Sequence, residues 1–230
     1  EHPYFRDHPG WFNGDGTCVC GGPGCDWNTH AIDCWFMPYL PDLDWTQGAV
    51  VDRMVADAQA LLVAADLDGF RVDAVKHMPH VAARTLGSRL REAFGTGNAT
   101  LYLVGETFTG DDGRPQIAEY LGPQELDAQF DFPLYWSIVR TFARDEATFV
   151  DLDAAVGASE AAFGRDSRMS PFLGNHDLPR FLSHAAGQIA DLWGNGARDQ
   201  GWTAPPASPA ADEPYQRAAL AFTFLFTQPG

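Results

Sequence analysis

Short apolar segments that end in carboxylates constrain this chain more than any other feature of its sequence. In residues 68–77, Asp-Gly-Phe-Arg-Val-Asp-Ala-Val-Lys-His, the apolar Phe70 and Val72 alternate with Arg71 and Asp73. Alternation with a period of two is typical of a β-strand, so Arg71 and Asp73 are expected to lie on the same side. An arginine at that distance would keep Asp73 ionised, as a nucleophilic carboxylate must be.

Two later segments repeat this arrangement. Residues 101–106 are an apolar run that ends at Glu106, and residues 170–177 end in Asn-His-Asp. An isolated Arg-x-Asp pair is most often a structural ion pair at a strand end, but three terminal acids in sequence order indicate a shared site. The apolar setting of Glu106 would favour a protonated acid, in contrast to Asp73.

Helical patterns separate these segments, and this alternation predicts the fold class. Strands that alternate with helices and end in functional residues are typical of a parallel α/β barrel of the TIM type, (β/α)8, whose active site lies at the carboxyl ends of the strands. An open doubly wound sheet is the alternative, which we disfavour because no glycine-rich phosphate loop follows any strand. The expected strands are 69–73, 101–104, 126–132 and 172–174, and the expected helices are 48–65, 79–94, 117–121, 135–142, 151–163 and 179–186. A loop rich in Pro and Ala is expected at 204–214, followed by a helix leading into a strand at 215–226.

Residues 1–47 have a different character from residues 48–230, and we predict them as a separate unit. They are rich in Gly, Pro, Asp, Asn and Trp and show little periodicity, which indicates a long irregular excursion. All four cysteines lie there, at Cys18, Cys20, Cys25 and Cys34. Two local disulfides in an oxidising compartment are the favoured interpretation, with the pairing open, and a zinc site is the alternative.

Charge and hydropathy narrow the possible partners. The chain has 230 residues with 15 basic and 31 acidic side chains, a net charge of −16. Such a chain repels phosphate backbones and anionic membranes, so a neutral substrate is favoured over nucleic acid. No apolar run reaches the length of a membrane-spanning helix, and no signal-like segment opens the sequence. Because the chain begins without Met and stops directly after an apolar run, we expect it to be part of a longer protein.

The motifs resemble those of the α-amylase family, glycoside hydrolase family 13. The resemblance rests on residues 69–77, on Gly105-Glu106 and on Asn175-His-Asp177, in this order, and Leu-Pro-Asp-Leu-Asp at 40–44 resembles an additional motif of the family. It implies a partial (β/α)8 barrel, from about the fourth to the eighth strand, preceded by an excursion like the family's domain B. The Asp-x-x-x-Asn-His motif expected on the third strand is not in this chain.

The resemblance also implies the roles of the site residues. Asp73 would be the nucleophile, Glu106 the general acid/base and Asp177 the third carboxylate, which holds sugar hydroxyls and stabilises the transition state. A retaining glycosidase needs one ionised and one protonated carboxyl group on either side of the scissile bond.

Further residues would bind substrate and metal. Arg71 would orient Asp73, and Asn175 and His176 would contact the sugar, while Lys76 and His77 would lie on the aglycone side. A calcium ion would be bound by Asp42 and by the backbone carbonyl of His77, since hard cations prefer oxygen ligands. Some of the tryptophans of the excursion are expected to present sugar-stacking surfaces, with core packing as the alternative for any single one; they are Trp11, Trp27, Trp35 and Trp45.

Three functional classes follow from these motifs. The first is a secreted or periplasmic retaining hydrolase, expected to be a monomer, that cleaves α-1,4-glucosidic bonds in starch, glycogen or maltooligosaccharides. The second is a transglycosylase or isomerase of the same family that uses the same acids. The third is a non-catalytic carbohydrate-binding relative, which we disfavour because none of the three acids is missing.

Overall fold

The computed structural model describes residues 6–20, 25–95, 101–164, 168–194 and 197–229. The chain divides into two compact units, which we describe separately. Unit 1 comprises Glu1–Glu106 and Tyr120–Asp127, and unit 2 comprises Thr107–Glu119 and Ala128–Gly230. This division falls elsewhere than residues 47 and 48, so the separate excursion predicted at 1–47 remains a prediction.

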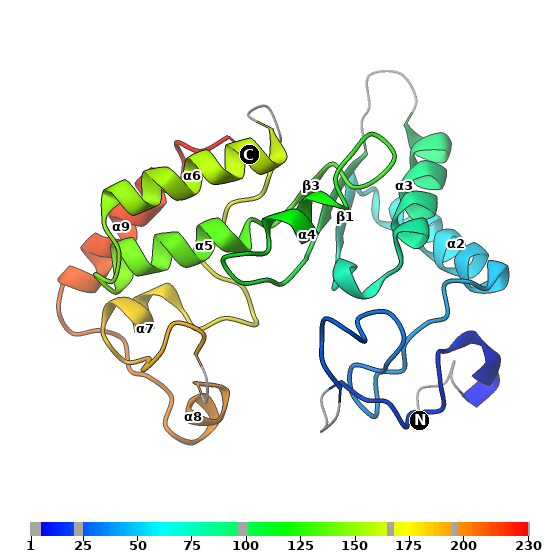
Figure 1. The fold of residues 1–230 in the computed structure, drawn as a ribbon, viewed down its shortest axis with the longest axis horizontal. Helices are drawn as coiled ribbons and strands as arrows, with labels where there is room; N and C mark the ends of the chain where they lie inside the picture. The colour runs from blue at the N-terminus through cyan, green and yellow to red at the C-terminus, as the bar shows by residue number, and fades with distance from the viewer. Residues whose placement is uncertain (1–5, 21–24, 96–100, 165–167, 195–196, 230) are drawn as a thin grey trace. The chain divides into compact units, whose positions relative to one another are not determined.

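Unit 1 contains a β-α-β arrangement that ends at two of the predicted acids. Strand β1 (Gly69–Val72) pairs in parallel with β2 (Tyr102–Gly105), with Gly69 opposite Tyr102 and Val72 opposite Gly105. Helix α2 (Gly48–Ala65) precedes β1, and α3 (His80–Phe94) connects the strands and lies beside α2 (Figure 1). A parallel pair needs such a crossover connection, so this part of the prediction is confirmed.

A single apolar core holds the strands and helices of unit 1 together. Val75, Leu90 and Leu103 have no exposed surface, and they share the core with five further buried side chains, Leu62, Ala83, Leu101, Tyr120 and Leu126. Gly69 is required where β1 begins, because a Cβ atom there would overlap the backbone carbonyl of Tyr102. The close approach of the two strands therefore depends on this glycine.

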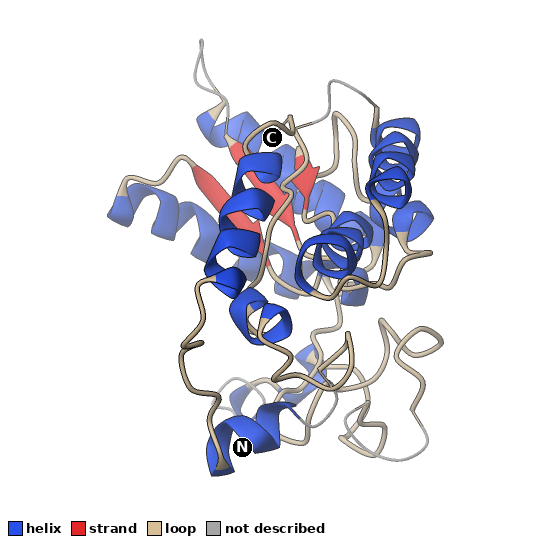
Figure 2. Ribbon diagram, turned by 90° about the vertical axis from the view of Figure 1, so that its left-hand side faces the viewer, coloured by secondary structure: helices blue, strands red, loops and turns tan. Residues whose placement is uncertain are grey.

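The excursion before α2 has little regular structure, as predicted, and Figure 2 shows it mainly as loop. It contains a 3₁₀ turn at Pro9–Trp11 and isolated bridges, including an antiparallel one between Phe12 and Leu43. Two disulfides, Cys18–Cys34 and Cys20–Cys25, cross-link it. The predicted number of disulfides is confirmed, and the structure supplies the pairing that the sequence left open.

Unit 2 is mainly helical. Strand β3 (Ala128–Gln129) is followed by α5 (Phe132–Ile138), which continues as a π-helical turn at Val139–Ala143. Its core is built on Phe132, Tyr135, Trp136, Ile138 and Val139, all without exposed surface. The other helices are α4 (Arg114–Ala118), α6 (Phe149–Phe163), α7 (Phe181–Ala185), α8 (Ala197–Thr203) and α9 (Glu213–Leu225), and α6 runs beside α5 (Figure 1).

Several predicted elements of unit 2 are wrong in extent or kind. The strand expected at 126–132 is reduced to β3, and residues 172–174 form no strand, because only a bridge between Phe130 and Ser170 is present. Pro171 follows the bridge and has no N–H for a ladder. The helix expected at 117–121 is α4, which begins at Arg114 with Pro115 in its first turn, and α8 was not predicted.

The described elements form part of an α/β architecture, and a closed or partial barrel is not established by them. Three short strands are present in the described residues, fewer than the predicted five. The last helix, α9, ends at Leu225 and is followed by a turn rather than a strand. Among the described residues, no helix combines the length and apolar character needed to cross a membrane.

Candidate active site

The segment after β1 changes direction directly beyond Asp73. Ala74 adopts the left-handed conformation, with φ 47° and ψ 40°, and a 3₁₀ turn at Val75–His77 follows it. This backbone region is unfavourable for a residue with a side chain, and it occurs mostly at sites where the surrounding structure enforces it. Asp73 therefore lies on a sharp turn, and its side chain is 70% exposed.

Arg71 contacts both carboxylates at the strand ends. Its Nη1 atom donates to Oδ1 of Asp73, and its Nη2 atom lies 2.6 Å from Oε1 of Glu106. The side chain of Glu106 is only 7% exposed. The expected pairing of Arg71 with Asp73 is confirmed, and Glu106 is buried with a guanidinium partner that the sequence did not indicate.

Backbone hydrogen bonds also connect the two strand ends. The amide of Glu106 donates to the carbonyl of Val72 at 2.9 Å, and the amide of Val75 donates to the carbonyl of Glu106 at 2.8 Å. Val75 is fully buried. The backbone of the Glu106 strand is thus held on both sides of Asp73, which limits how far the two acids can move relative to each other.

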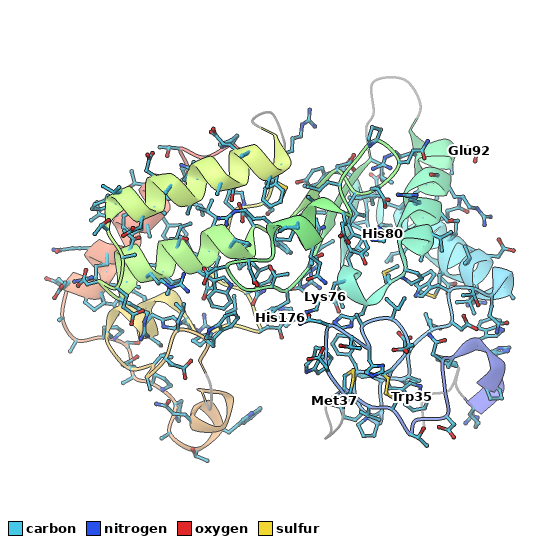
Figure 3. The ribbon with its side chains drawn as sticks, viewed as in Figure 1. Trp35, Met37, Lys76, His80, Glu92 and His176 are labelled. Atoms are coloured by element: carbon cyan, nitrogen blue, oxygen red, sulfur yellow. A yellow bond between two sulfur atoms is a disulfide. The ribbon has the colours of Figure 1, made fainter. Side chains whose placement is uncertain are left out.

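Lys76 and His77, which follow Val75, face the excursion. Burial lowers the pKa of the Lys76 ammonium group, and the Asp26 carboxylate opposes this effect. Figure 3 labels Lys76 at the end of this segment, and it labels Trp35 and Met37 in the excursion. His77 is 8% exposed, its Nδ1 atom lies 2.8 Å from the carbonyl oxygen of Ala31, and burial lowers its pKa to about 4. The imidazole is therefore neutral at physiological pH.

The carboxyl group of Asp42, the predicted calcium ligand, has surroundings that disfavour its ionised form. Its Oδ2 atom accepts a hydrogen bond of 2.6 Å from the side-chain amide of Asn13. Burial raises its pKa to about 6, and the nearby carboxylates of Asp33 and Asp44 act in the same direction. A cation would stabilise the ionised form, so the chemistry of this carboxyl group suits the predicted metal.

The same loop connects Asp42 with His77. The Asn13 amide that donates to Asp42 also lies 3.3 Å from the carbonyl oxygen of Ile32, and the ring of His77 contacts the carbonyl of the preceding residue, Ala31. Asn13 thus links Asp42 to the loop that the His77 ring contacts directly.

The third predicted acid lies in unit 2. The side-chain oxygen of Asn175 accepts a hydrogen bond of 2.9 Å from the amide of Asp177, a local turn that fixes the backbone before the acid. Nε2 of His176 lies 3.3 Å from Oδ2 of Asp177. Both side chains are largely exposed, His176 by 73% and Asp177 by 49%. The convergence of Asp177 with Asp73 and Glu106 remains a prediction.

The cysteine cluster gives no support to the zinc alternative. In the described chain, the sulfur atoms of Cys18, Cys25 and Cys34 lie close enough together to share a metal. All four cysteines are disulfide-bonded, however, and no free cysteine is present in the described residues. Zinc binds thiolates, so the disulfide-bonded form lacks the required ligands.

The tryptophans of the excursion have different environments. Trp35 is 6% exposed, and its indole N–H donates to the carbonyl of Asn13, so it is a core residue. Trp11 stacks on His8 with 4.1 Å between ring centroids. Trp27 packs edge-on against His77. Trp35 therefore follows the core-packing alternative, and a sugar-stacking role for other tryptophans of the excursion remains a prediction.

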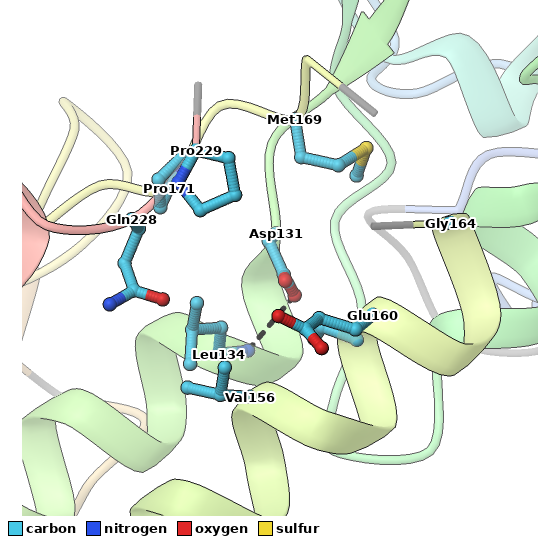
Figure 4. Close-up of a pocket in the computed structure, with 10 residues that line it drawn as sticks. Asp131, Leu134, Val156, Glu160, Gly164, Met169, Pro171, Gln228 and Pro229 are labelled. Atoms are coloured by element: carbon cyan, nitrogen blue, oxygen red, sulfur yellow. Dashed lines mark hydrogen bonds between the residues drawn. The ribbon is translucent and has the colours of Figure 1, made fainter. Parts of the chain in front are cut away.

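A pocket in unit 2 is lined by other residues than the predicted site residues. Asp131, from the turn between β3 and α5, and Glu160, from α6, line it together with Met169 and Gln228 (Figure 4). Burial raises the pKa of Asp131, whose Oδ1 atom accepts a hydrogen bond from the amide of Leu134 at the start of α5. Asp131 is thus a helix-capping residue, and none of the predicted site residues lines this pocket.

Sequence reasoning missed the contacts that organise the site. It did not identify the contact of Arg71 with Glu106, the left-handed Ala74 or the contact of His77 with Ala31. These contacts join residues far apart in the chain, except at Ala74. No periodicity or motif in a single sequence indicates them.

Comparisons with known proteins agree with the motifs. The family model described as "Alpha amylase, catalytic domain" matches residues 25–194. A "Beta/alpha-amylase" of Paenibacillus polymyxa is 27% identical over 94% of this chain and 15% of its own length. A "Cyclomaltodextrin glucanotransferase" of Bacillus licheniformis is 29% identical over 79% of this chain and 24% of its own length.

A solved structure is similar over the whole chain. The α-amylase of Geobacillus thermoleovorans, in a complex with acarbose, superposes with a TM-score of 0.76 at 26% identity, and the match covers 100% of this chain and 44% of that one. The chain therefore spans less than half the length of these relatives. Since the family model covers most of the sequence, the chain belongs to the α-amylase family of enzymes, glycoside hydrolase family 13.

Proposed function

We propose that the protein containing this chain is a retaining glycoside hydrolase that cleaves α-1,4-glucosidic bonds in starch, glycogen or maltooligosaccharides. The observation that carries this proposal is the arrangement around Arg71, which contacts one exposed and one buried carboxylate at neighbouring parallel strand ends. Two carboxylates in different environments are what a retaining glycosidase uses for two different roles.

The proposed reaction assigns one step to each acid. Asp73 attacks the anomeric carbon and forms a covalent glycosyl intermediate, while Glu106 donates a proton to the leaving glycosidic oxygen. Glu106 then removes a proton from water, which attacks the intermediate and releases Asp73. Arg71 orients both carboxylates throughout, and Asp177 is assigned to hold sugar hydroxyls and to stabilise the transition state.

The other predicted residues are assigned to binding. Asn175 and His176 would contact the same sugar as Asp177, and Lys76 and the Nε2 atom of His77 would contact the sugar on the aglycone side. Calcium would be held by Asp42 and by the backbone carbonyl of His77, where it would neutralise the half-buried carboxylate and fix the excursion. No step of the reaction passes through the metal.

The proposed setting is extracellular or periplasmic. The two disulfides of the excursion support an oxidising compartment, since such bonds are rare in reducing cytosol. The net charge of −16 supports a neutral glucan as the substrate. We propose a monomer that binds neither nucleic acid nor membrane.

A transglycosylase is the second candidate, and one comparison favours it. The glucanotransferase of Bacillus licheniformis matches this chain at 29% identity, close to the 27% of the amylase from Paenibacillus polymyxa. Both activities would use the same two acids and differ in whether water or a sugar hydroxyl attacks the intermediate.

The test combines a variant with product analysis in the full-length protein. Asp73→Asn is expected to lower kcat on maltoheptaose by more than about 10³-fold, because it removes the nucleophile and keeps its shape. Asp153→Asn, the same change at an exposed position of α6, is the control and should keep wild-type activity. Near-native activity of Asp73→Asn would contradict the proposal.

Product analysis separates the two candidates. Hydrolysis yields a new reducing end for every bond cleaved, whereas transfer produces longer or cyclic chains without a net gain of reducing ends. If wild-type protein releases no reducing ends from maltoheptaose but lengthens it, the transglycosylase assignment replaces the hydrolase.

A further inference from the structure

The imidazole ring of His77 is enclosed by side chains of the excursion. The centroid of the Phe36 ring lies 4.4 Å from the centroid of the imidazole, with an interplanar angle of 69°. The centroid of the Trp27 ring lies 5.7 Å from it, with an angle of 82°. Trp27 and Phe36 also contact each other edge-on, at 4.9 Å. With 8% of its surface exposed, His77 is held on the excursion rather than pointing freely into solvent.

The polar contact of this ring has a defined direction. A backbone carbonyl can only accept a hydrogen bond, so Nδ1 of His77 must carry the proton that it donates to Ala31 at 2.8 Å. The two aromatic rings limit the access of water to this hydrogen bond, which increases its contribution to the local structure. Nε2 is the acceptor in this tautomer.

The loop that provides Ala31 is itself constrained. The disulfide Cys18–Cys34 closes it, and backbone hydrogen bonds from Trp35 to Cys18 at 3.0 Å and from Cys20 to Trp35 at 2.7 Å align its two ends. Within the loop, the Asp26 carboxylate accepts hydrogen bonds from the amide and the hydroxyl group of Thr29. The acceptor for His77 is therefore held in place before any substrate binds.

On its other side, His77 is connected to both catalytic strands. It ends the short 3₁₀ turn whose first residue, Val75, donates its amide proton to the carbonyl of Glu106, and Ala74 joins this turn to Asp73. A displacement of His77 would therefore shift the turn that determines the direction of Asp73. The turn thus links the hydrogen bond between His77 and Ala31 to the strand ends at Asp73 and Glu106.

We propose that His77 is a positioning residue, whose Nδ1–H···O=C hydrogen bond to Ala31 fixes the disulfide-bonded loop against the turn that follows the nucleophile. The role rests on the proposed function, because it acts on the placement of Asp73 and Glu106. It is distinct from any contact of Nε2 with sugar, which would change substrate binding instead.

Two variants of His77 separate these roles in the full-length protein. His77→Asn retains a donor close to the position of Nδ1 and loses the rest of the ring, whereas His77→Phe retains the aromatic packing and loses the donor. Both variants lack Nε2, so a loss of sugar contact raises KM in both. Only His77→Phe is expected to lower kcat, by about tenfold, because the reacting groups become misplaced.

Hydrogen–deuterium exchange without substrate provides a readout that does not depend on activity. Peptides covering residues 26–36 are expected to exchange about fivefold faster in His77→Phe than in wild type, as the loss of one hydrogen bond predicts, and to stay near wild type in His77→Asn. Phe36→Leu keeps the donor but opens the enclosure, and it should also increase exchange. His80→Phe is the control, because His80 stacks on Tyr120 outside the enclosure.

The outcomes distinguish this proposal from the proposed function. Equal kcat and equal exchange in His77→Phe and His77→Asn would overturn the positioning role. If the wild-type protein lacks activity on glucans, the proposed function fails, while the exchange measurement still decides whether His77 fixes the loop. If His77→Phe does not fold, Phe36→Leu decides by the same exchange criterion.

Discussion

Asp42 and Glu106 are both carboxyl groups of unit 1 with limited exposure, but their surroundings compensate them differently. Glu106 lies 2.6 Å from a guanidinium nitrogen of Arg71, whereas the carboxyl group of Asp42 receives a neutral amide, that of Asn13. Burial and neighbouring acids accordingly raise the pKa of Asp42 to about 6. A group of this kind gains more from a bound cation than one that is already paired.

The pKa of Asp42 leads to a pH prediction for the metal-free protein. The carboxyl group titrates near 3.8 in the unfolded chain and near 6 in the folded one, so the folded state binds the proton more tightly. Its contribution to the free energy of unfolding is present below about pH 4 and is lost as the pH rises through 6. In EDTA, Asp42→Asn should therefore become more stable than wild type across this window, by about 1–2 kcal/mol after discounting for solvent screening.

Denaturant unfolding at pH 4 and pH 7 measures this difference. The control is Asp15→Asn, because hydrogen bonds from Thr17 lower the pKa of Asp15 and its contribution changes with pH in the opposite direction. A constant difference between Asp42→Asn and wild type over this range would show that burial does not raise the pKa of Asp42.

At the scale of elements, the sequence was sufficient where local pattern and tertiary packing agree. Helices α2 and α3 were predicted to within about two residues at their ends, because each has an apolar face and α3 has a clear boundary residue in Pro79. Strands β1 and β2 were also predicted, as was the position of Asp73 and Glu106 directly after them. These features depend on residues near one another in the chain.

The missed elements depend on contacts that a single sequence does not display. Helix α6 begins at Phe149, earlier than predicted, because Thr148 and Asp151 form a capping box that periodicity does not reveal. Likewise, the absence of the strand expected at 172–174 reflects Pro171, which has no N–H to donate to a ladder. The enclosure of His77 joins two distant parts of the chain, residues 27–36 and the turn at His77, and no local pattern indicates it.

The disulfide pairing of the excursion leads to a prediction at the same scale. If Cys18 pairs with Cys34 and Cys20 with Cys25, the double variant Cys20→Ser/Cys25→Ser should contain no free thiol, because the other disulfide stays intact. The double variant Cys18→Ser/Cys25→Ser should expose two thiols. Each disulfide is expected to stabilise the excursion by about 2–3 kcal/mol.

Thiol titration of the unfolded, unreduced variants decides between the pairings. The reduced and alkylated wild-type protein provides the reference for four thiols. Free thiols in Cys20→Ser/Cys25→Ser would contradict the pairing, and four free thiols in wild type together with bound zinc would restore the zinc alternative.

At the scale of the whole molecule, the predicted catalytic residues are divided between the two units. Asp73 and Glu106 belong to unit 1, and Asp177 belongs to unit 2. Membership of the α-amylase family places all three motifs within one matched region, residues 25–194. Because the chain spans 44% of the similar amylase structure, the complete protein is the form in which activity and metal binding should be tested.

The last prediction is that the thermal stability of the full-length protein depends on calcium. An ion at Asp42 and the carbonyl of His77 would connect the excursion with the turn after β1, near the loop that His77 contacts directly and Asp42 reaches through Asn13. Since the ion would bind the folded state alone, calcium at 100 times its Kd should stabilise the full-length protein by about 2.7 kcal/mol. EDTA should lower the melting temperature and restored calcium should recover it, while Asp42→Asn should respond to neither. An unchanged melting temperature in wild type, with no calcium found by elemental analysis, would leave Asp42 as a buried carboxyl group without a metal.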